Sequence, residues 1–428
     1  MSLYKTSARN SNLREFSKDI WIRRYNNSPS IYFRGYFRIY RKLLNYITIM
    51  GKKFRPKSFT LQWHITERCN WRCKHCYQEN YSTDEMRIEK IEQILLQFVG
   101  LIKKWKLPRE FARIQITGGE PFLREDFFII LEKIHAYSEY FSWGIMSNGS
   151  LLTEEIVKRL KAWGIEFFQV SLEGAQETND EIRGEGSFQK VLKAIRLLSK
   201  EKIDIAVSLS LTKQNFKEIS GLALLLAPLG VSRIGVRRIA PFGAGGRQQL
   251  HMLLEPVELQ KLYREIQKIN KDLINDKSRL KVLGGCENAI FNDEIAHPAL
   301  MSFGTCGVND GRIFTIMPDG DAYICRRLPI KIGNILKKPL EDIYYSPIYE
   351  NLRAEKNDAP LECYPCPNSK SCLGGAKCVT YAVTGKTSPD VQCWKLFGSL
   401  KESIPYIKRQ NFFKKILLFL RVYTIYKR

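Results

Sequence analysis

The chain has 428 residues, of which 44% are hydrophobic and 26% charged, and its formal net charge is +24. This composition is typical of a folded protein and excludes a wholly disordered or collagen-like chain. At this length we expect a main domain with at least one appended module. The N-terminus has no apolar segment typical of a secretion signal, so a cytoplasmic location is predicted. In a reducing compartment, eleven cysteines indicate metal ligands or reactive thiols rather than disulfides.

Positive charge is concentrated at the two ends of the chain. Residues 1–60 carry fourteen lysines and arginines against two acids, and residues 401–428 carry eight against one. In both ends, residues 31–48 and 411–428 combine basic side chains with aromatic and aliphatic ones at helical spacing. Such helices suit an anionic membrane surface, so we interpret the ends as peripheral contacts at its inner face. Packing on the main domain is the alternative, and no nucleic-acid partner is expected.

Strand-like and helix-like patterns alternate through the first two thirds of the chain. The predicted strands are Ser58–Thr66, Arg113–Thr117, Phe141–Asn148, Glu166–Glu173, Asp204–Thr212 and Arg233–Pro241. Helical segments are predicted at Asp84–Lys104, Asp126–Tyr140, Thr153–Trp163, Phe188–Lys200 and Phe216–Leu226. Residues Ile219–Val231 are too short to cross a membrane and are predicted to form a buried helix. Six successive βα units favour an α/β fold with a parallel sheet, either doubly wound or a partial barrel.

Residues with useful chemistry stand where these strands end, and such ends share one edge of a parallel sheet. Cys69, Cys73 and Cys76 follow the first strand in a C-x3-C-x2-C spacing, "TGGEP" (Thr117–Pro121) follows the second, "SNG" (Ser147–Gly149) closes the third and "SLEG" (Ser171–Gly174) closes the fourth. Three thiolates fit a zinc site completed by His64 or His75. They also fit an iron–sulfur cluster in which one iron stays open. His75 lies inside the loop, where its ring is poorly placed to share the metal.

Together these motifs resemble the radical S-adenosylmethionine (SAM) superfamily. The resemblance implies a partial (βα)6, TIM-like barrel over residues 58–250, a [4Fe–4S] cluster on Cys69, Cys73 and Cys76, and SAM bound to the open iron. It further implies reductive cleavage of SAM to a 5′-deoxyadenosyl radical that abstracts hydrogen from the substrate. Where the family more often has Asp, this chain has Glu173. The implied cofactor-binding residues are His75, Gly118, Gly119, Glu120, Pro121, Ser147, Asn148, Ser171, Glu173 and Arg183.

The C-terminal third holds seven more cysteines, after a bridging helical segment over residues 251–303. Cys306 and Cys325 form a C-x13-G-x4-C pattern whose "PDGD" predicts a hairpin turn. Zinc ribbons are the alternative explanation of the C-x2-C pair. Residues 304–398 resemble a SPASM extension, which implies two auxiliary iron–sulfur clusters. By position, the first cluster would use Cys306, Cys325 and Cys378, with Cys286 as a remote fourth candidate; the second would use Cys363, Cys366, Cys372 and Cys393. The interval from Cys372 to Cys378 is two residues longer than is common in SPASM extensions.

The resemblance implies an enzyme, and we predict a ribosomally made precursor peptide or protein as its substrate, which would be crosslinked, epimerised or oxidised. A small-molecule or tetrapyrrole substrate, or a non-catalytic electron-transfer protein, are the alternatives. Ferredoxin or flavodoxin is the expected reductant. The basic aromatic residues 1–57 are too few for a leader-binding domain, so a separate partner is predicted for that task, and residues 399–428 form a basic tail.

No catalytic acid or base can be assigned from the sequence. Sulfatase-maturing relatives carry an Asp at the position of Arg326, and a guanidinium does not act as a base near neutral pH. We therefore predict that no formylglycine is formed. Binding of an acidic substrate group and simple surface solvation remain the two interpretations of Arg326 and Arg327.

Overall fold

The computed structural model describes residues 54–285, apart from 80 and 83, and residues 306–409, apart from 357, 358 and 388. The chain divides into two compact units, residues 1–55 and 56–428. Nearly all described residues belong to the second unit. The predicted terminal helices at 31–48 and 411–428, and the candidate ligand Cys286, lie outside the described residues.

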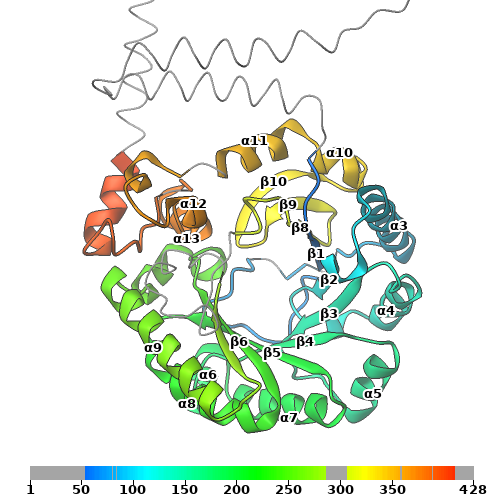
Figure 1. The fold of residues 1–428 in the computed structure, drawn as a ribbon. Coiled ribbons are helices and arrows are strands. Elements are labelled where there is room, and N and C mark those ends of the chain that lie inside the picture. Colours follow the sequence, from blue (N-terminus) through cyan, green and yellow to red (C-terminus); the bar gives the residue numbers. More distant parts are fainter. Residues whose placement is uncertain are drawn as a thin grey trace, which may run out of the picture. The chain divides into compact units, whose positions relative to one another are not determined.

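A single ten-stranded sheet organises this second unit (Figure 1). Its strand order is β10-β9-β8-β1-β2-β3-β4-β5-β6-β7. From β8 to β7 every neighbouring pair is parallel, whereas β9 and β10 are antiparallel to their neighbours. The two edge strands, β10 and β7, do not pair with each other, so the sheet forms a partial barrel as predicted. The strands are β1 (Phe59–His64), β2 (Ala112–Thr117), β3 (Ser142–Ser147), β4 (Phe167–Ser171), β5 (Asp204–Leu211), β6 (Val231–Arg238), β7 (Lys281–Gly284), β8 (Ile313–Ile316), β9 (Asp321–Cys325) and β10 (Leu328–Asn334).

Helices cover the outer side of the curved sheet (Figure 1). In helix α3, the apolar residues recur every three or four positions, so they share one face, and this face is buried against the sheet. From this face, Phe98 and Trp105 contact Phe59 of β1. The α-helices are α3 (Ile88–Trp105), α4 (Phe127–Ala136), α5 (Glu154–Ala162), α6 (Gln176–Arg183), α7 (Ser187–Lys200), α8 (Ile219–Leu226), α9 (Pro256–Asn275), α10 (Leu340–Tyr344), α11 (Pro347–Lys356), α12 (Ser369–Cys372) and α13 (Lys377–Thr384). Short 3-10 helices are η1 (Arg109–Phe111), η2 (Pro121–Leu123), η3 (Phe216–Glu218), η4 (Ala227–Leu229), η5 (Gly243–Met252) and η7 (Leu361–Cys363), and residues 400–409 are helical.

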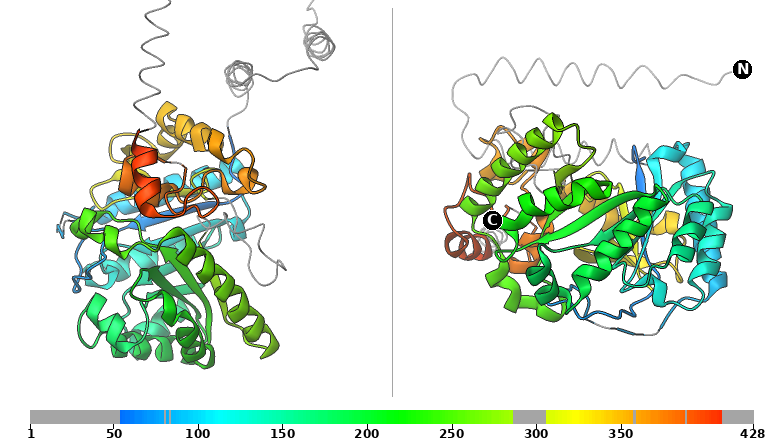
Figure 2. Two further views of the ribbon diagram at one scale, coloured as in Figure 1. Left: turned by 90° about the vertical axis from the view of Figure 1, so that its left-hand side faces the viewer. Right: turned by 90° about the horizontal axis from the view of Figure 1, so that it is seen from below.

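The C-terminal third is joined to the barrel through the sheet itself. Strand β8 pairs in parallel with β1, and the predicted "PDGD" turn connects β8 to β9 as an antiparallel hairpin. In the left view of Figure 2, the elements after residue 340, coloured orange to red, lie above most of the green helices of the barrel. The hairpin therefore extends the barrel sheet rather than standing as a separate layer.

Two sequence expectations differ from the structure. The segment Ile219–Val231 is not a single buried helix: α8 ends at Leu226, and the Leu224 side chain is 71% exposed. The helix lies on the barrel surface, so only one of its faces meets the core. Strand β7 lies within residues 251–303, for which a bridging helical segment is predicted: α9 is a helix, but Lys281–Gly284 pair in parallel with β6 and extend the barrel sheet.

Candidate active site

The loop after β1 carries Cys69, Cys73 and Cys76 at the carboxyl end of the barrel. The three thiols lie close enough to influence one another electrostatically, but burial has the largest effect, raising the pKa of Cys69 to about 11 and also raising that of Cys73. A metal centre held by these thiols must therefore displace their protons. The structure thus brings together the three cysteines that the sequence singled out.

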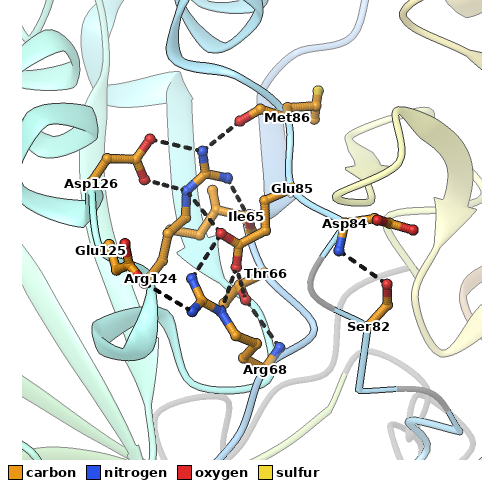
Figure 3. Close-up of polar contacts among 10 residues, drawn as sticks. All are labelled: Ile65, Thr66, Arg68, Ser82, Asp84, Glu85, Met86, Arg124, Glu125 and Asp126. Atoms are coloured by element: carbon orange, nitrogen blue, oxygen red, sulfur yellow. Dashed lines mark hydrogen bonds and ion pairs between the residues drawn. The ribbon is translucent and has the colours of Figure 1, made fainter.

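A buried arginine ties the two ends of this cysteine loop together (Figure 3). Arg124, 3% exposed, donates to the carbonyl oxygens of Ile65 (2.6 Å) and Met86 (2.5 Å). Its guanidinium also pairs with Asp126, with Nε 2.6 Å from Oδ1. Glu85 adds a second tie, since it accepts from Arg68 Nε at 3.0 Å and from the Thr66 hydroxyl. Arg124 was not predicted as a site residue. The sequence gives little indication of this role, because Arg124 is a single arginine between the "GGEP" turn and a helix.

The "GGEP" turn packs directly against the start of the same loop. The amides of Gly119 and Glu120 donate to the carbonyl oxygens of Thr66 (2.9 Å) and Arg68 (2.7 Å). A Cβ atom at Gly118 would overlap the backbone of Thr66, and one at Gly119 would overlap that of Arg68. Side chains are therefore excluded at both glycines, which bring the backbone of the turn beside the cysteine loop.

Glu120 is a fully buried carboxyl group next to this loop. It accepts hydrogen bonds from the Ser147 hydroxyl (2.9 Å), the Asn148 amide (2.8 Å) and the Phe122 amide (3.2 Å). Burial raises its pKa to about 7 even though these donors favour the ionised form. The Asn148 side chain meanwhile donates to the Asn70 side chain at 2.9 Å, which ties the end of β3 to the cysteine loop. A carboxyl group in this setting is suited to bind a cation.

A second buried carboxylate, Glu173, joins two further predicted residues. Its Oε1 lies 3.0 Å from His75 Nε2 and 3.1 Å from Arg183 Nε, and its Oε2 accepts from the Ser210 amide at 2.6 Å. Burial alone would raise the pKa of Glu173, but the charges of Arg183 and His75 outweigh it and lower this pKa to about 2. Arg183 also reaches Cys73 Sγ at 3.7 Å. Glu173 thus positions two side chains at the cysteine loop.

The remaining predicted residues of the barrel lie at the same edge of the sheet. Pro121 is buried and begins η2. Ser171 ends β4, beside Ser208 of β5. All ten predicted cofactor-binding residues consequently surround the carboxyl ends of β1 to β4, where the topology of a parallel sheet places them.

Four cysteines of the C-terminal third line one cavity of about 380 Å³, together with Asp390 and Lys395. Burial raises the pKa of Cys372 to about 11 and that of Cys363 to about 12. The cavity brings together the four thiols assigned by position to one auxiliary cluster, namely Cys363, Cys366, Cys372 and Cys393. A sulfur-lined cavity of this kind fits a multi-iron cluster.

A buried ion pair links this cavity to the barrel. Arg238, at the end of β6, donates to both carboxylate oxygens of Asp390 at 3.2 and 2.9 Å, and both side chains are at most 2% exposed. Asp390 also accepts from the amides of Ala376 (2.9 Å) and Gln392 (3.0 Å). Because a buried carboxylate needs such partners, the cavity wall is held to the barrel at this point.

The cysteines assigned by position to the other auxiliary cluster are more dispersed in sequence. Cys306 precedes β8, Cys325 ends β9 and Cys378 lies on α13. The buried ammonium of Lys377, next to Cys378, has Cys306 and Cys372 among its electrostatic neighbours. Within the described ranges, no three His, Cys, Asp or Glu side chains are arranged to hold a single metal ion.

Two family models match the chain. The radical SAM superfamily model matches residues 63–226, which contain the cysteine loop and "GGEP", and an iron–sulfur cluster-binding domain model, SPASM, matches residues 306–367. The chain belongs to the radical SAM superfamily and carries a SPASM domain. A radical SAM protein of this type contains [4Fe–4S] clusters and binds SAM. No helix in the described part of this radical SAM protein is long and apolar enough to span a membrane.

Several known proteins resemble this one over most of its length. It is 27% identical over 356 residues to mycofactocin maturase MftC of Mycolicibacterium smegmatis, covering 79% of this chain and 83% of MftC. It is 25% identical over 405 residues to Fe-coproporphyrin III synthase of Methanosarcina barkeri, covering 87% and 94%. The crystal structure of Streptococcus suis SuiB bound to precursor peptide SuiA has a TM-score of 0.63 at 17% identity, covering 90% of this chain and 87% of SuiB. That likeness concerns the fold.

Proposed function

We propose that this radical SAM enzyme modifies a ribosomally made precursor peptide or protein by crosslinking, epimerisation or oxidation. The observation that supports this proposal is the similarity to mycofactocin maturase over 79% of the chain. The fold shared with SuiB, which has been crystallised with its precursor peptide, is consistent with it. When bound, the clusters and SAM supply a carbon-centred radical that removes hydrogen from an unactivated C–H bond.

The barrel residues would hold the cofactor in place for this chemistry. Cys69, Cys73 and Cys76 would ligate the SAM-binding cluster. The buried carboxyl of Glu120 would accept the ammonium group of SAM, since a neighbouring cation favours its ionised form. The other residues proposed to contact or position the cofactor are His75, Gly118, Gly119, Pro121, Ser147, Asn148, Ser171, Glu173 and Arg183. Their task is to bind and orient the cofactor and to exclude water from it.

The SPASM domain would hold auxiliary clusters. The four cysteines that line the 380 Å³ cavity form the better supported set, because a shared cavity is what a common cluster would need. Cys306, Cys325 and Cys378 would hold a second auxiliary cluster, and its fourth candidate, Cys286, lies outside the described residues. We also propose domain limits of 1–57, 58–250, 251–303, 304–398 and 399–428.

The peptide proposal is tested with the anaerobically reconstituted enzyme, SAM, a reductant and synthetic peptides encoded by short open reading frames next to its gene. The expected result is a peptide mass change that requires SAM and accompanies 5′-deoxyadenosine. A variant with Cys69, Cys73 and Cys76 changed to Ala is the matched control and should leave the peptide unchanged. SAM cleavage without any peptide modification across the set would contradict the proposal.

A tetrapyrrole substrate is the second candidate, because Fe-coproporphyrin III synthase resembles this chain over 87% of its length. The same assay with a panel of iron tetrapyrroles that carry carboxylate side chains, in place of peptide, distinguishes the two. Loss of mass from the porphyrin, with no change in any peptide, would favour this candidate.

Partners are proposed from the chemistry and from the charge of the chain. A ferredoxin or flavodoxin would supply the electron, and a separate protein would bind a leader peptide. The basic ends would contact an anionic membrane. Co-sedimentation with anionic liposomes tests this last proposal by comparing the full chain with a form that lacks residues 1–50 and 405–428. Only the full chain should pellet; equal behaviour of the two forms would remove the idea.

A further inference from the structure

An arginine whose buried Nε atom has no hydrogen-bond partner among the described residues lies beside the cysteine loop, at the end of the SPASM hairpin. Arg326 directly follows β9, and its guanidinium lies over the ring of Tyr77, 4.5 Å from the ring centroid. Its Nε atom is buried and has no hydrogen-bond partner. None of the ion pairs among the described residues includes Arg326. A buried N–H donor without an acceptor destabilises the folded protein unless a ligand accepts its hydrogen bond.

His64 offers a second unsatisfied atom beside it. His64 ends β1, where strand alternation places it on the same inner face as Gln62, which meets Thr315 of β8. The ring is only 2% exposed, and its Nε2 has no hydrogen-bond partner in the described part of the chain. Burial, and then the charge of Arg326, lower the pKa of His64 well below its usual value, so the imidazole is neutral. A neutral imidazole can donate one hydrogen bond without adding charge.

The other charged groups nearby leave this positive charge unmatched. Arg327, the next residue, is turned away and donates to the carbonyl oxygen of Arg238. Glu67 lies within electrostatic range of Arg326 but forms no ion pair with it among the described residues. The subsite formed by Arg326, Tyr77 and His64 therefore carries positive charge, since Arg326 lies over Tyr77 and Arg327 is also within electrostatic range of that ring, and this charge suits an anion.

The position of this subsite relates it to the substrate. Tyr77 adjoins Cys76 of the cysteine loop, and Arg326 adjoins Cys325 of the SPASM hairpin. Tyr77 lies within electrostatic range of both cysteines. The Arg326 side chain thus lies between the SAM-binding loop, through Tyr77, and the SPASM hairpin that carries it.

We propose that Arg326, oriented by Tyr77 and assisted by His64, binds a carboxylate group of the substrate. The planar guanidinium offers two parallel N–H donors that match a carboxylate, and stacking on Tyr77 holds this plane in position. The inference deepens the proposed function. The carboxylate can belong to an acidic residue of a peptide or to a propionate of a tetrapyrrole.

Binding to the full-length reconstituted enzyme with SAM tests this inference against both sources. Two pools of random heptapeptides differ only in having Glu or Gln at the central position, and retention is measured by mass spectrometry. Coproporphyrin III and its tetramethyl ester form the second pair, with binding measured by fluorescence quenching. The variants are R326Q, R326K and the control R279Q, which removes the same charge from an arginine that is 68% exposed. Iron content and thermal unfolding establish that each variant is folded.

The wild-type enzyme should prefer the acidic member of at least one pair by about tenfold, and R326Q should reduce that preference to about twofold or less. R326K should retain part of it, because an ammonium keeps the charge but cannot donate as a fork. If R326Q fails to hold iron, the intermediate preference of R326K serves as the test. R279Q should match the wild type.

The inference is overturned if wild type shows no acid preference in either pair, or if folded Arg326 variants keep the full preference. Preference for the peptide pair alone supports both the inference and the peptide proposal. Preference for the porphyrin pair alone supports the inference while contradicting the peptide proposal, so the two failures are distinguishable.

Discussion

Replacing Arg124 by methionine should open the cysteine loop from both ends. The guanidinium is 3% exposed and bridges the carbonyl oxygens of Ile65 and Met86, which lie 21 residues apart on either side of the three cysteines. Methionine keeps most of the side-chain volume but has no donor. The change therefore removes the tie between the loop ends while disturbing the packing little.

The expected loss follows from the bonds that disappear. A hydrogen bond to a charged group contributes about 1.5–3 kcal/mol, and two such bonds to backbone oxygens are lost in R124M. Asp126 is partly exposed and its carboxylate is resolvated by water, so its ion pair adds little. We expect the free energy of unfolding to fall by about 3–5 kcal/mol, in the range seen when one partner of a buried charge pair is removed.

The assay is urea unfolding of the apoprotein under anaerobic conditions, followed by tryptophan fluorescence, with iron analysis after reconstitution. R109M is the matched control: Arg109 also pairs with a carboxylate, Glu166, and donates to a backbone oxygen, but it is 44% exposed. Its loss should be about 1 kcal/mol or less. R124M should also lose about a third of the iron, the share of one cubane cluster in three. A loss equal to that of R109M, with full iron, would refute this account of the loop.

Three further results are expected. The reconstituted enzyme should contain about twelve irons. Changing Cys69, Cys73 and Cys76 together to Ala should abolish SAM cleavage while leaving about two thirds of the iron. Stoichiometric zinc in protein isolated without oxygen would contradict the assignment of auxiliary iron–sulfur clusters. A sulfatase peptide should give no formylglycine by mass spectrometry, because Arg326 cannot accept a proton near neutral pH. Finally, burial raises the pKa of Glu120 from 4.5 to about 7, so between these pH values the folded state binds more protons than the unfolded state. The free energy of unfolding should therefore fall as the pH rises from 4.5 to about 7. In urea titrations, E120Q should lack this part of the pH dependence.

The positions of six strands along the chain and of the motifs at their ends could be predicted from the sequence because both depend on local signals. Alternating apolar residues define each strand, and the ends of parallel strands must meet at one edge of the sheet. The cysteine loop and "GGEP" consequently lie together as expected. The SPASM hairpin was also predicted, since the "PDGD" turn between two strand-like segments is a local signal.

The contacts that hold the site together join residues that are far apart in the chain, and no local sequence pattern predicts such contacts. Arg124 reaches back 59 residues to Ile65, and Arg238 meets Asp390 after 152 residues. The exposed face of α8 is a similar case: its composition suggests burial, but its position on the outer layer leaves Leu224 in solvent. Likewise, the sequence alone left Arg326 with two interpretations, because the lack of a hydrogen-bond partner for its buried Nε atom among the described residues is visible only in three dimensions.

The pairing of β1 with β8 has a consequence for biosynthesis. One side of β1 pairs with β2, but the other must wait for residues 313–316, roughly 250 residues later in the chain. At about 5–20 residues per second, a ribosome needs roughly 13–50 s to deliver them. During that interval β1 is an unprotected strand edge, available to other chains. A chaperone bound to the first half of the nascent chain during this interval should therefore increase the yield of soluble enzyme, whereas slower translation should lower it.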